Sequence, residues 1–387
     1  MFPHKSTIDN IINQSIAAGE YAGASLLVLK EGEELIRDVY GEADMENHVP
    51  VKRDTIFHLY SMSKPITAVA VMKLYEQSKL QLQDEVGLYL PCFKHMMVWT
   101  DAGEVPAKRG ITVWDCLNMT TGIPYPCQEL ESGRQMDAVF RSLIARREAG
   151  EFVDTMEWMK EVAKVPLVFQ PGEKWMYGFS ADVLGAVVEA ASGKRFGQFL
   201  REEIFEPLGM PDTGFFVPEE KKHRFAVSYE NWSTGKLIPF TRSHLGEYYN
   251  SDVAFESGGA GLVSTIDDYA RFAQMLLNGG SLGEIRVLKP ETVALMSRNQ
   301  LTAIQRIGYN WDSVQGYGYG CLMRCLEDKD KAQSRGSIGE YGWDGWTGNY
   351  VTINPKENLV LLFFSQRCGT GFGELTRKVR EEIYAKL

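Results

Sequence analysis

The sequence lacks the features of a membrane-spanning or exported chain. None of its 387 residues belongs to an apolar run of about 18, the length that crosses a bilayer. Segment 1–21 alternates polar and apolar residues at helical spacing and has no apolar signal core, so we expect a cytoplasmic location. The chain also lacks an excess of positive charge: 51 acidic residues outnumber 41 Lys and Arg, and the net charge is -10. Because nucleic acids and anionic membranes are bound mainly through Lys and Arg, neither is an expected partner.

Cysteine and histidine are too few and too scattered to indicate a disulfide framework or a metal centre. Six cysteines in a chain of this length do not make a disulfide-stapled scaffold. Cys321 and Cys325 are separated by three residues, but no second Cys or His pair at ligand spacing accompanies them. We therefore expect reduced thiols, no metal and no other cofactor.

Two common hydrolase signatures are missing as well. There is no HExxH sequence of a zinc hydrolase and no GxSxG sequence of an α/β-hydrolase. The nearest approach to the second, Gly178-Phe-Ser180-Ala-Asp182, lacks the final glycine. Both classes of enzyme lose most of their support.

Strand patterns lie at both ends of the chain, and helical patterns lie between them. The chain exceeds the size at which one hydrophobic core keeps growing, so we expect two packed lobes. An α/β lobe takes residues 1–85 and 255–387, and a mostly helical lobe takes residues 86–254. The expected strands are 22–30, 34–40, 316–323, 350–353 and 359–365. The expected helices are 65–80, 136–147, 154–163, 180–191, 264–277 and 374–387.

The sharpest local feature is Ser61-Met-Ser-Lys64-Pro65, at the start of a predicted helix. Residues three apart face the same way, and the positive end of the helix dipole with partial burial favours a neutral lysine amine. Such an amine can take the serine proton. A helix-capping serine followed by a solvated lysine explains the spacing equally well. The same spacing recurs at Ser233 and Lys236, in a polar turn where nothing holds the two side chains together.

The surroundings of Ser61 separate these alternatives. The Ser61 run continues to Leu90, and four later segments follow it: Ile111–Ile123, Pro171–Tyr177, Phe205–Met210 and Gly258–Thr265. In order and spacing the five segments resemble the serine β-lactamase and penicillin-binding superfamily, in particular its class C β-lactamase, DD-peptidase and family VIII carboxylesterase branch. The resemblance implies an antiparallel sheet flanked by helices and formed from both termini, a mostly helical inserted lobe, and an active site in the cleft between them.

The resemblance also implies three catalytic motifs. The first is Ser61-x-x-Lys64, and the second falls on Tyr177-Gly178-Phe179. Tyr177 is the expected general base, although an aromatic residue that closes the following helix would look the same. Phe179 stands where the β-lactamases carry an asparagine that contacts the substrate amide. Ser251-Asp252-Val253 resembles a class A motif but lacks its asparagine, and we interpret it as a loop.

The third motif falls on Trp343-Asp344-Gly345, where much of the family carries a cation. Trp343 offers a flat apolar wall instead, with plain core packing as the alternative. Gly345 lets substrate approach the strand edge, and the N–H groups of Ser61 and Trp346 form the expected oxyanion hole. The expected substrate contacts are Trp343, Asp344, Gly345, Phe179 and either Tyr248 or Tyr249.

These residues predict a serine hydrolase that works through an acyl-Ser61 intermediate. The intact Ser-Lys-Tyr set and the two replaced residues favour a carboxylesterase with weak or no β-lactamase activity. A class C-type β-lactamase or DD-peptidase is the first alternative, and an acyltransferase or a non-catalytic binder on the same fold is the second. The expected partner is a small-molecule ester or β-lactam, and no pattern bears on the oligomeric state.

Overall fold

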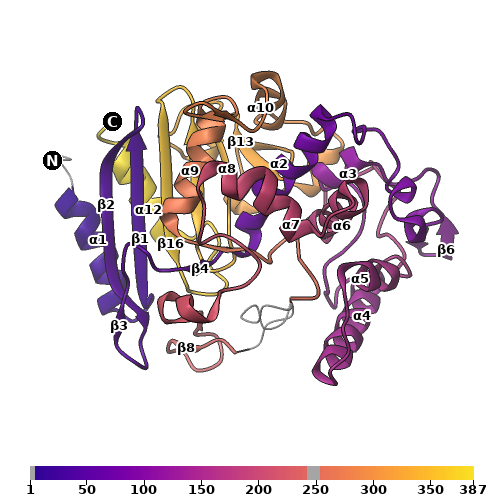
Figure 1. Cartoon of the computed structure of the whole chain (residues 1–387), viewed down its shortest axis with the longest axis horizontal. Helices are drawn as coiled ribbons and strands as arrows, with labels where there is room; N and C mark the ends of the chain where they lie inside the picture. Colours follow the sequence, from indigo (N-terminus) through magenta and orange to yellow (C-terminus); the bar gives the residue numbers. More distant parts are fainter. Residues whose placement is uncertain (1–4, 242–252) are drawn as a thin grey trace.

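An eight-stranded antiparallel sheet forms the centre of the computed structural model, which describes residues 5–241 and 253–387 (Figure 1). β1 pairs with β2 on one side and with β16 on the other, so the two ends of the chain meet inside one sheet. The predicted antiparallel sheet built from both termini is confirmed. In sheet order the strands are β12 (Tyr317–Gly320), β13 (Met323–Leu326), β14 (Tyr341–Asp344), β15 (Tyr350–Asn354), β16 (Leu359–Ser365), β1 (Gly23–Lys30), β2 (Glu33–Asp44) and β3 (Val49–Pro50).

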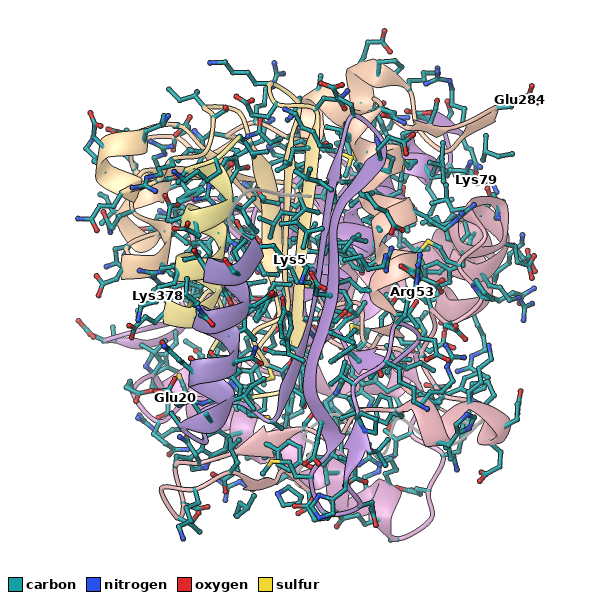
Figure 2. All side chains as sticks on the ribbon, turned by 90° about the vertical axis from the view of Figure 1, so that its left-hand side faces the viewer. Lys5, Glu20, Arg53, Lys79, Glu284 and Lys378 are labelled. Carbon is teal, nitrogen blue, oxygen red and sulfur yellow. The ribbon has the colours of Figure 1, made fainter. Side chains whose placement is uncertain are left out.

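Both faces of this sheet are covered, which explains the continuous apolar run of β16. Successive β16 side chains point to opposite faces and join two different hydrophobic clusters. Helices α1 (Lys5–Ala17) and α12 (Glu374–Tyr384) lie side by side on one face, as Figure 2 shows. Helices α2 (Ser63–Glu76) and α9 (Ile266–Leu277) pack on the other face. The nucleophile predicted from the sequence lies on the α2 side.

The remaining elements surround α2 and extend away from the sheet, toward the right of Figure 1. The predicted helices 136–147, 154–163 and 180–191 are found with shifted ends, as α4, α5 and α6. The helices of this part are α3 (Val113–Leu117), α4 (Glu131–Glu148), α5 (Thr155–Val162), α6 (Ser180–Ser192), α7 (Phe196–Leu200), a π-helical turn (Arg201–Phe205) and α8 (Glu206–Leu208). Two short helices, α10 (Pro290–Met296) and α11 (Lys329–Ala332), follow later in the chain. The small strand pairs are β4 (Phe57–His58) with β9 (Val263–Ser264), β5 (Met97–Thr100) with β6 (Gly103–Pro106), β7 (Tyr229–Glu230) with β8 (Ile238–Pro239), and β10 (Ser281–Leu282) with β11 (Ile285–Arg286).

One strand prediction was wrong. The run 316–323 is not one strand but β12 and the start of β13, joined by a tight turn at Cys321 and Leu322. Both turn residues have left-handed backbones (φ 46° and 63°), which in hairpins usually calls for Gly or Asn. Here tertiary contacts hold the turn, because the Leu322 N–H donates to the Leu117 carbonyl (2.8 Å) and the Cys321 N–H to Asn118 Oδ1 (3.2 Å).

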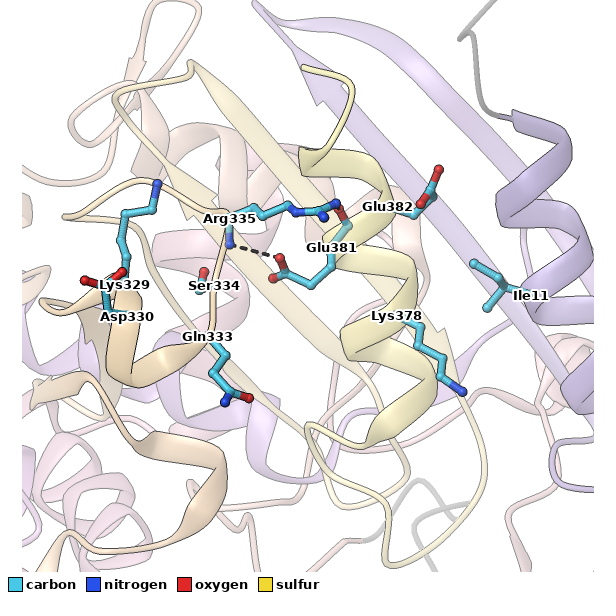
Figure 3. Close-up of a pocket in the computed structure, with 9 residues that line it drawn as sticks. All are labelled: Ile11, Lys329, Asp330, Gln333, Ser334, Arg335, Lys378, Glu381 and Glu382. Carbon is cyan, nitrogen blue, oxygen red and sulfur yellow. Dashed lines mark hydrogen bonds between the residues drawn. The ribbon is translucent and has the colours of Figure 1, made fainter.

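The face under α12 holds a buried ion pair. The side chains of Arg380 and Glu340 are each 1% exposed, and Arg380 also donates to Ser334 Oγ (2.9 Å) and to the Tyr350 hydroxyl (3.1 Å). An open pocket lies outside this pair, lined by charged side chains of α12 and of the α11 region (Figure 3). Ser334 in its wall accepts the hydrogen bond from Arg380.

Two further expectations concern thiols and membranes. All six cysteines are free thiols. Within residues 5–241 and 253–387, no helix has the length and apolar character needed to cross a bilayer.

Candidate active site

Ser61 lies in a short 3₁₀ turn, Tyr60–Met62, that leads directly into α2. Lys64 is the second residue of α2, and its Nζ lies 3.1 Å from Ser61 Oγ. The serine is partly exposed, whereas the lysine is fully buried. The structure therefore brings together the two side chains that the sequence pattern pairs, and the amine is shielded from water.

Tyr60, the residue before Ser61, has a left-handed backbone (φ 47°). This conformation is rare for a bulky residue and costs on the order of 1–3 kcal/mol, so surrounding contacts must hold it. The Tyr60 ring lies 3.8 Å from the His58 ring and 5.4 Å from the Trp346 ring, measured between centroids. The strain sits directly at the nucleophile, where it sets the direction of the Ser61 backbone.

Three hydrogen-bond acceptors surround the Lys64 amine. Its Nζ donates to Ser61 Oγ (3.1 Å), the Tyr125 hydroxyl (3.3 Å) and the Gly259 carbonyl (2.8 Å). The same nitrogen lies 4.6 Å from the centroid of the Tyr177 ring. An ammonium ion would donate one N–H bond to each of these oxygens, whereas a neutral amine would accept a hydrogen bond from one of the two hydroxyls. The Tyr125 and Gly259 oxygens come from distant segments, which the local sequence does not reveal.

Tyr177 reaches Ser61 from the segment that precedes α6. Its hydroxyl lies 2.7 Å from Ser61 Oγ, which is closer than the Lys64 amine at 3.1 Å. The Trp343 indole N–H donates to the same hydroxyl (3.4 Å), and the two rings stack with centroids 5.8 Å apart. The Tyr177 hydroxyl thus lies in direct contact with the nucleophile, where a proton can pass between the two oxygens.

A tight turn after β14 brings the third motif against the nucleophile. A Cβ on Gly345 would lie 2.3 Å from the Leu59 carbonyl oxygen, so only glycine allows this approach. The Gly345 N–H donates to the Asn349 carbonyl (2.7 Å), and the Asn349 amide donates to the His58 carbonyl (2.7 Å). This glycine therefore serves a contact between two backbone segments, and it places Trp346 beside the segment that carries Ser61.

Aromatic side chains stand on two sides of the reactive groups. On one side the Tyr177 ring contacts Trp175, Trp311 and Trp343, with centroid distances of 5.3 to 6.2 Å. On the other side Trp346 contacts Tyr60, Trp232 and Phe240, with centroid distances of 5.2 to 5.8 Å. Trp232 and Trp311 are 57% and 41% exposed, so each set offers apolar surface to solvent next to the site.

Several predicted site residues lie elsewhere or are otherwise engaged. Phe179 is fully buried in an aromatic cluster with Phe140, Trp158 and Phe255, and it offers no surface to a substrate. The Asp344 carboxylate is engaged in an ion pair with the buried Arg324 guanidinium. Tyr248 and Tyr249 lie outside the described residues, as do Ser251 and Asp252.

The second Ser-x-x-Lys sequence occupies the turn between β7 and β8, as predicted. Ser233 donates its hydroxyl hydrogen to the carboxylate of Glu230, and Lys236 is exposed. Nothing in this turn holds the lysine against the serine.

Four residues that matter at the site escaped the sequence analysis: Tyr125, Asp182, Gly259 and Asn349. Asp182 carried a usable signal, because it is an acidic residue directly before the apolar stretch Val183–Val188 of α6. Gly259 lies inside the segment Gly258–Thr265 singled out above, although its contact with Lys64 was not expected. Tyr125 and Asn349 carried no signal, since a side chain that meets the site from a distant segment leaves no local pattern.

Comparisons with known proteins agree with this geometry. The family model described as Beta-lactamase matches residues 8–385. Protein Rv1367c of Mycobacterium tuberculosis (strain ATCC 25618 / H37Rv) is 32% identical, over 92% of this chain and 88% of its own length. Esterase EstB of Burkholderia gladioli is 30% identical, over 98% of this chain and 95% of its own length. The solved structure of EstCE1, described as a hydrolase with promiscuous acyltransferase activity, superposes with a TM-score of 0.82 at 25% identity, covering 98% of each chain.

Proposed function

The chain belongs to the Beta-lactamase family and is a serine hydrolase, and from this premise we propose that it is a carboxylesterase acting through an acyl-Ser61 intermediate. One observation carries the proposal. Ser61 Oγ lies within hydrogen-bond distance of two groups at once, the Tyr177 hydroxyl (2.7 Å) and the Lys64 amine (3.1 Å). The proposal keeps the predicted two-lobe division, with the site where residues 86–254 meet the rest of the chain.

In the acylation step Ser61 Oγ attacks the ester carbonyl carbon while its proton moves to the Tyr177 oxygen. The Lys64 amine, 4.6 Å from the centroid of the Tyr177 ring, stands beside this oxygen during the transfer. The tetrahedral intermediate then expels the alcohol, which leaves with the proton held by Tyr177. In deacylation a water molecule gives its proton to Tyr177, attacks the acyl carbon and releases the acid, and the proton returns to Ser61.

The negative charge that develops on the carbonyl oxygen needs donors. The backbone N–H groups of Ser61 and Trp346 are the proposed pair. Support comes from the Gly345 turn, whose close approach to the Leu59 carbonyl brings the Trp346 segment to the Ser61 segment. The strained Tyr60 backbone supports the same pairing, because it sets the direction of the adjoining Ser61 N–H.

The preference for neutral esters rests on what stands beside Tyr177. By the resemblance, Trp343 stands where other members of the family carry a cation. Its side chain is buried (2% exposed), so it brings no charge to the site and contributes the indole N–H and the ring that stacks on Tyr177. Arg324 lies 5.4 Å from the Trp343 ring centroid, but it is only 3% exposed and its charge is neutralised by Asp344. A carboxylate-bearing substrate would therefore lose its hydration without gaining a partner. The similarity to Esterase EstB agrees with this preference.

Acyl transfer is the second candidate on the same intermediate. The observation that favours it is the exposed apolar surface of Trp232 and Trp311 beside the site, which suits an apolar alcohol better than water. EstCE1, described as having promiscuous acyltransferase activity, is similar in fold and sequence. Addition of a primary alcohol distinguishes the two outcomes, because a transferase forms the new ester at the expense of free acid.

The test compares the two Ser-x-x-Lys sequences of this chain. Ser61→Ala is expected to lower kcat for p-nitrophenyl butyrate by about 10⁴-fold or more, since the covalent route is lost. Ser233→Ala is the matched control, and its kcat is expected to stay at the wild-type value. Intact mass after exposure to diethyl p-nitrophenyl phosphate should show one added diethyl phosphoryl group on the control and none on Ser61→Ala. Unchanged ester turnover by Ser61→Ala would refute the proposal, and nitrocefin turnover equal to ester turnover would favour a β-lactamase.

A further inference from the structure

Asp182 is a fully buried carboxylate that takes no part in the proposed proton transfers. It lies in the first turn of α6, five residues after Tyr177, and is 1% exposed. Burial of an ionised carboxylate is costly unless it is paired or hydrogen-bonded. Its Oδ1 accepts hydrogen bonds from the Ser257 hydroxyl and from the Gly259 backbone N–H (3.1 Å). The position at the helix N-terminus also favours negative charge.

Gly259 joins this carboxylate to the catalytic lysine. Its N–H donates to Asp182, and its carbonyl accepts from Lys64 Nζ at 2.8 Å. A Cβ on Gly259 would lie 2.5 Å from Asp182 Oδ2 and 3.0 Å from the Tyr125 hydroxyl, so both groups press against the face that glycine leaves open. The backbone of Gly259 thus links the two side chains: its N–H binds the Asp182 carboxylate, and its carbonyl binds the Lys64 amine.

Electrostatics connects the same two residues. Burial raises the pKa of the Asp182 carboxyl, whereas the positive charge of Lys64 and the hydrogen bonds from Ser257 and Gly259 act to lower it. Among the described residues, the ionisable groups that face Lys64 are Tyr125, Tyr177 and Asp182. The two tyrosines are neutral until they lose a proton, so Asp182 is the acid that balances the buried ammonium.

We propose that Asp182 is a positioning residue: it fixes the Gly259 carbonyl under Lys64 and supplies the buried negative charge that keeps Lys64 an ammonium beside Ser61. This role rests on the proposed function, because the ammonium matters only if Tyr177 takes the Ser61 proton. Asp182 does not touch the substrate. Without it, Lys64 would be a buried cation with neutral acceptors alone, and it would lose its proton at lower pH.

The test is the pH profile of Asp182→Asn. Asparagine keeps an oxygen for Ser257 and Gly259 but removes the charge. The alkaline limb of kcat/KM for p-nitrophenyl butyrate, where Lys64 loses its proton, is expected to move to lower pH by about one unit or more. The rate of diethyl phosphorylation of Ser61 should show the same displaced limb. If kcat/KM fell by the same factor at every pH and the alkaline limb stayed at the wild-type pH, the role of Asp182 would be structural alone, and the inference would be overturned.

A matched control is Asp115→Asn. Asp115 is also a buried carboxylate (4% exposed) with a cationic partner, Arg109, but it serves the capping box of α3 and contacts neither Lys64 nor Ser61. Its replacement is expected to lower stability and to leave the alkaline limb in place. If the alkaline limb of Asp115→Asn moves as far as that of Asp182→Asn, the shift is a general effect of lowered stability, and the inference is refuted.

Ser257→Ala keeps the experiment decisive if Asp182→Asn does not fold. In this variant the ionised Asp182 carboxylate loses the hydrogen bond that Ser257 donates, so Asp182 takes up a proton at higher pH. The acid limb of the kcat/KM profile should therefore move to higher pH. A profile that is scaled down without a shift would contradict the inference. Failure of the proposed function is a separate outcome. In that case Ser61→Ala would keep its ester turnover, independently of the pH profile of Asp182→Asn.

Discussion

Replacement of Gly345 by alanine tests how the oxyanion hole is built. The added Cβ would lie 2.3 Å from the Leu59 carbonyl oxygen, whereas ordinary contacts of a Cβ begin near 3.4 Å. One of the two backbone segments must therefore retreat by about 1 Å, because a packed interior has no free space to absorb the methyl group. These are the segments that lead to the N–H groups of Ser61 and Trp346.

The magnitude follows from what such a displacement does to catalysis. A misplacement of about 1 Å costs on the order of 10²-fold in rate, and loss of one oxyanion donor costs about 10²–10³-fold. We expect kcat of Gly345→Ala to fall within that range, with a stability loss of about 1–3 kcal/mol from overpacking. The assays are steady-state hydrolysis of p-nitrophenyl butyrate and urea unfolding followed by circular dichroism.

Gly214→Ala is the control for this experiment. A Cβ on Gly214 would have its nearest neighbour, the Phe216 carbonyl oxygen, at 4.0 Å, so its kcat is expected to match the wild type. If folded Gly345→Ala kept kcat within about 2-fold of the wild type, far less than one lost oxyanion donor costs, then the turn would not set the oxyanion hole and the reasoning would be refuted.

Three further changes probe separate parts of the molecule. Tyr177→Phe should lower kcat by about 10²–10⁴-fold in the same ester assay, because the base is removed; an unchanged kcat would exclude Tyr177 as the base. Arg380→Met leaves Glu340 as an unpaired charge in the core and should cost about 3–5 kcal/mol in urea unfolding; a loss below about 1 kcal/mol would contradict the buried ion pair. Burial raises the pKa of Asp268 to about 6 from 3.8, so the folded state holds this proton at higher pH than the unfolded state does. Stability should therefore fall by about 3 kcal/mol in all as the pH rises from well below 3.8 to well above 6, and Asp268→Asn should lose this dependence; equal pH slopes of unfolding free energy would be the contrary result.

The sequence by itself determined the elements whose signal is local. Periodicity located the central strands and the long helices, since a face buried along a strand or helix leaves a repeat in the chain. It also placed Ser61 and Lys64 together, because they stand three positions apart at the start of a helix, where residues at this spacing face the same way. The downstream segments in register identified Tyr177 as their partner before any contact was known.

The tertiary structure decided everything that depends on groups brought from a distance. The Lys64 amine contacts oxygens other than that of Ser61 because Tyr125 and Gly259 reach it from remote segments. Gly345 is needed for a backbone approach to Leu59 and not only for the substrate, and Asp344 faces Arg324 instead of the site. Packing also removed Phe179 into the core, since an aromatic residue next to a catalytic tyrosine can face either way. Such choices depend on which neighbours the fold supplies, and no local pattern in the chain records them.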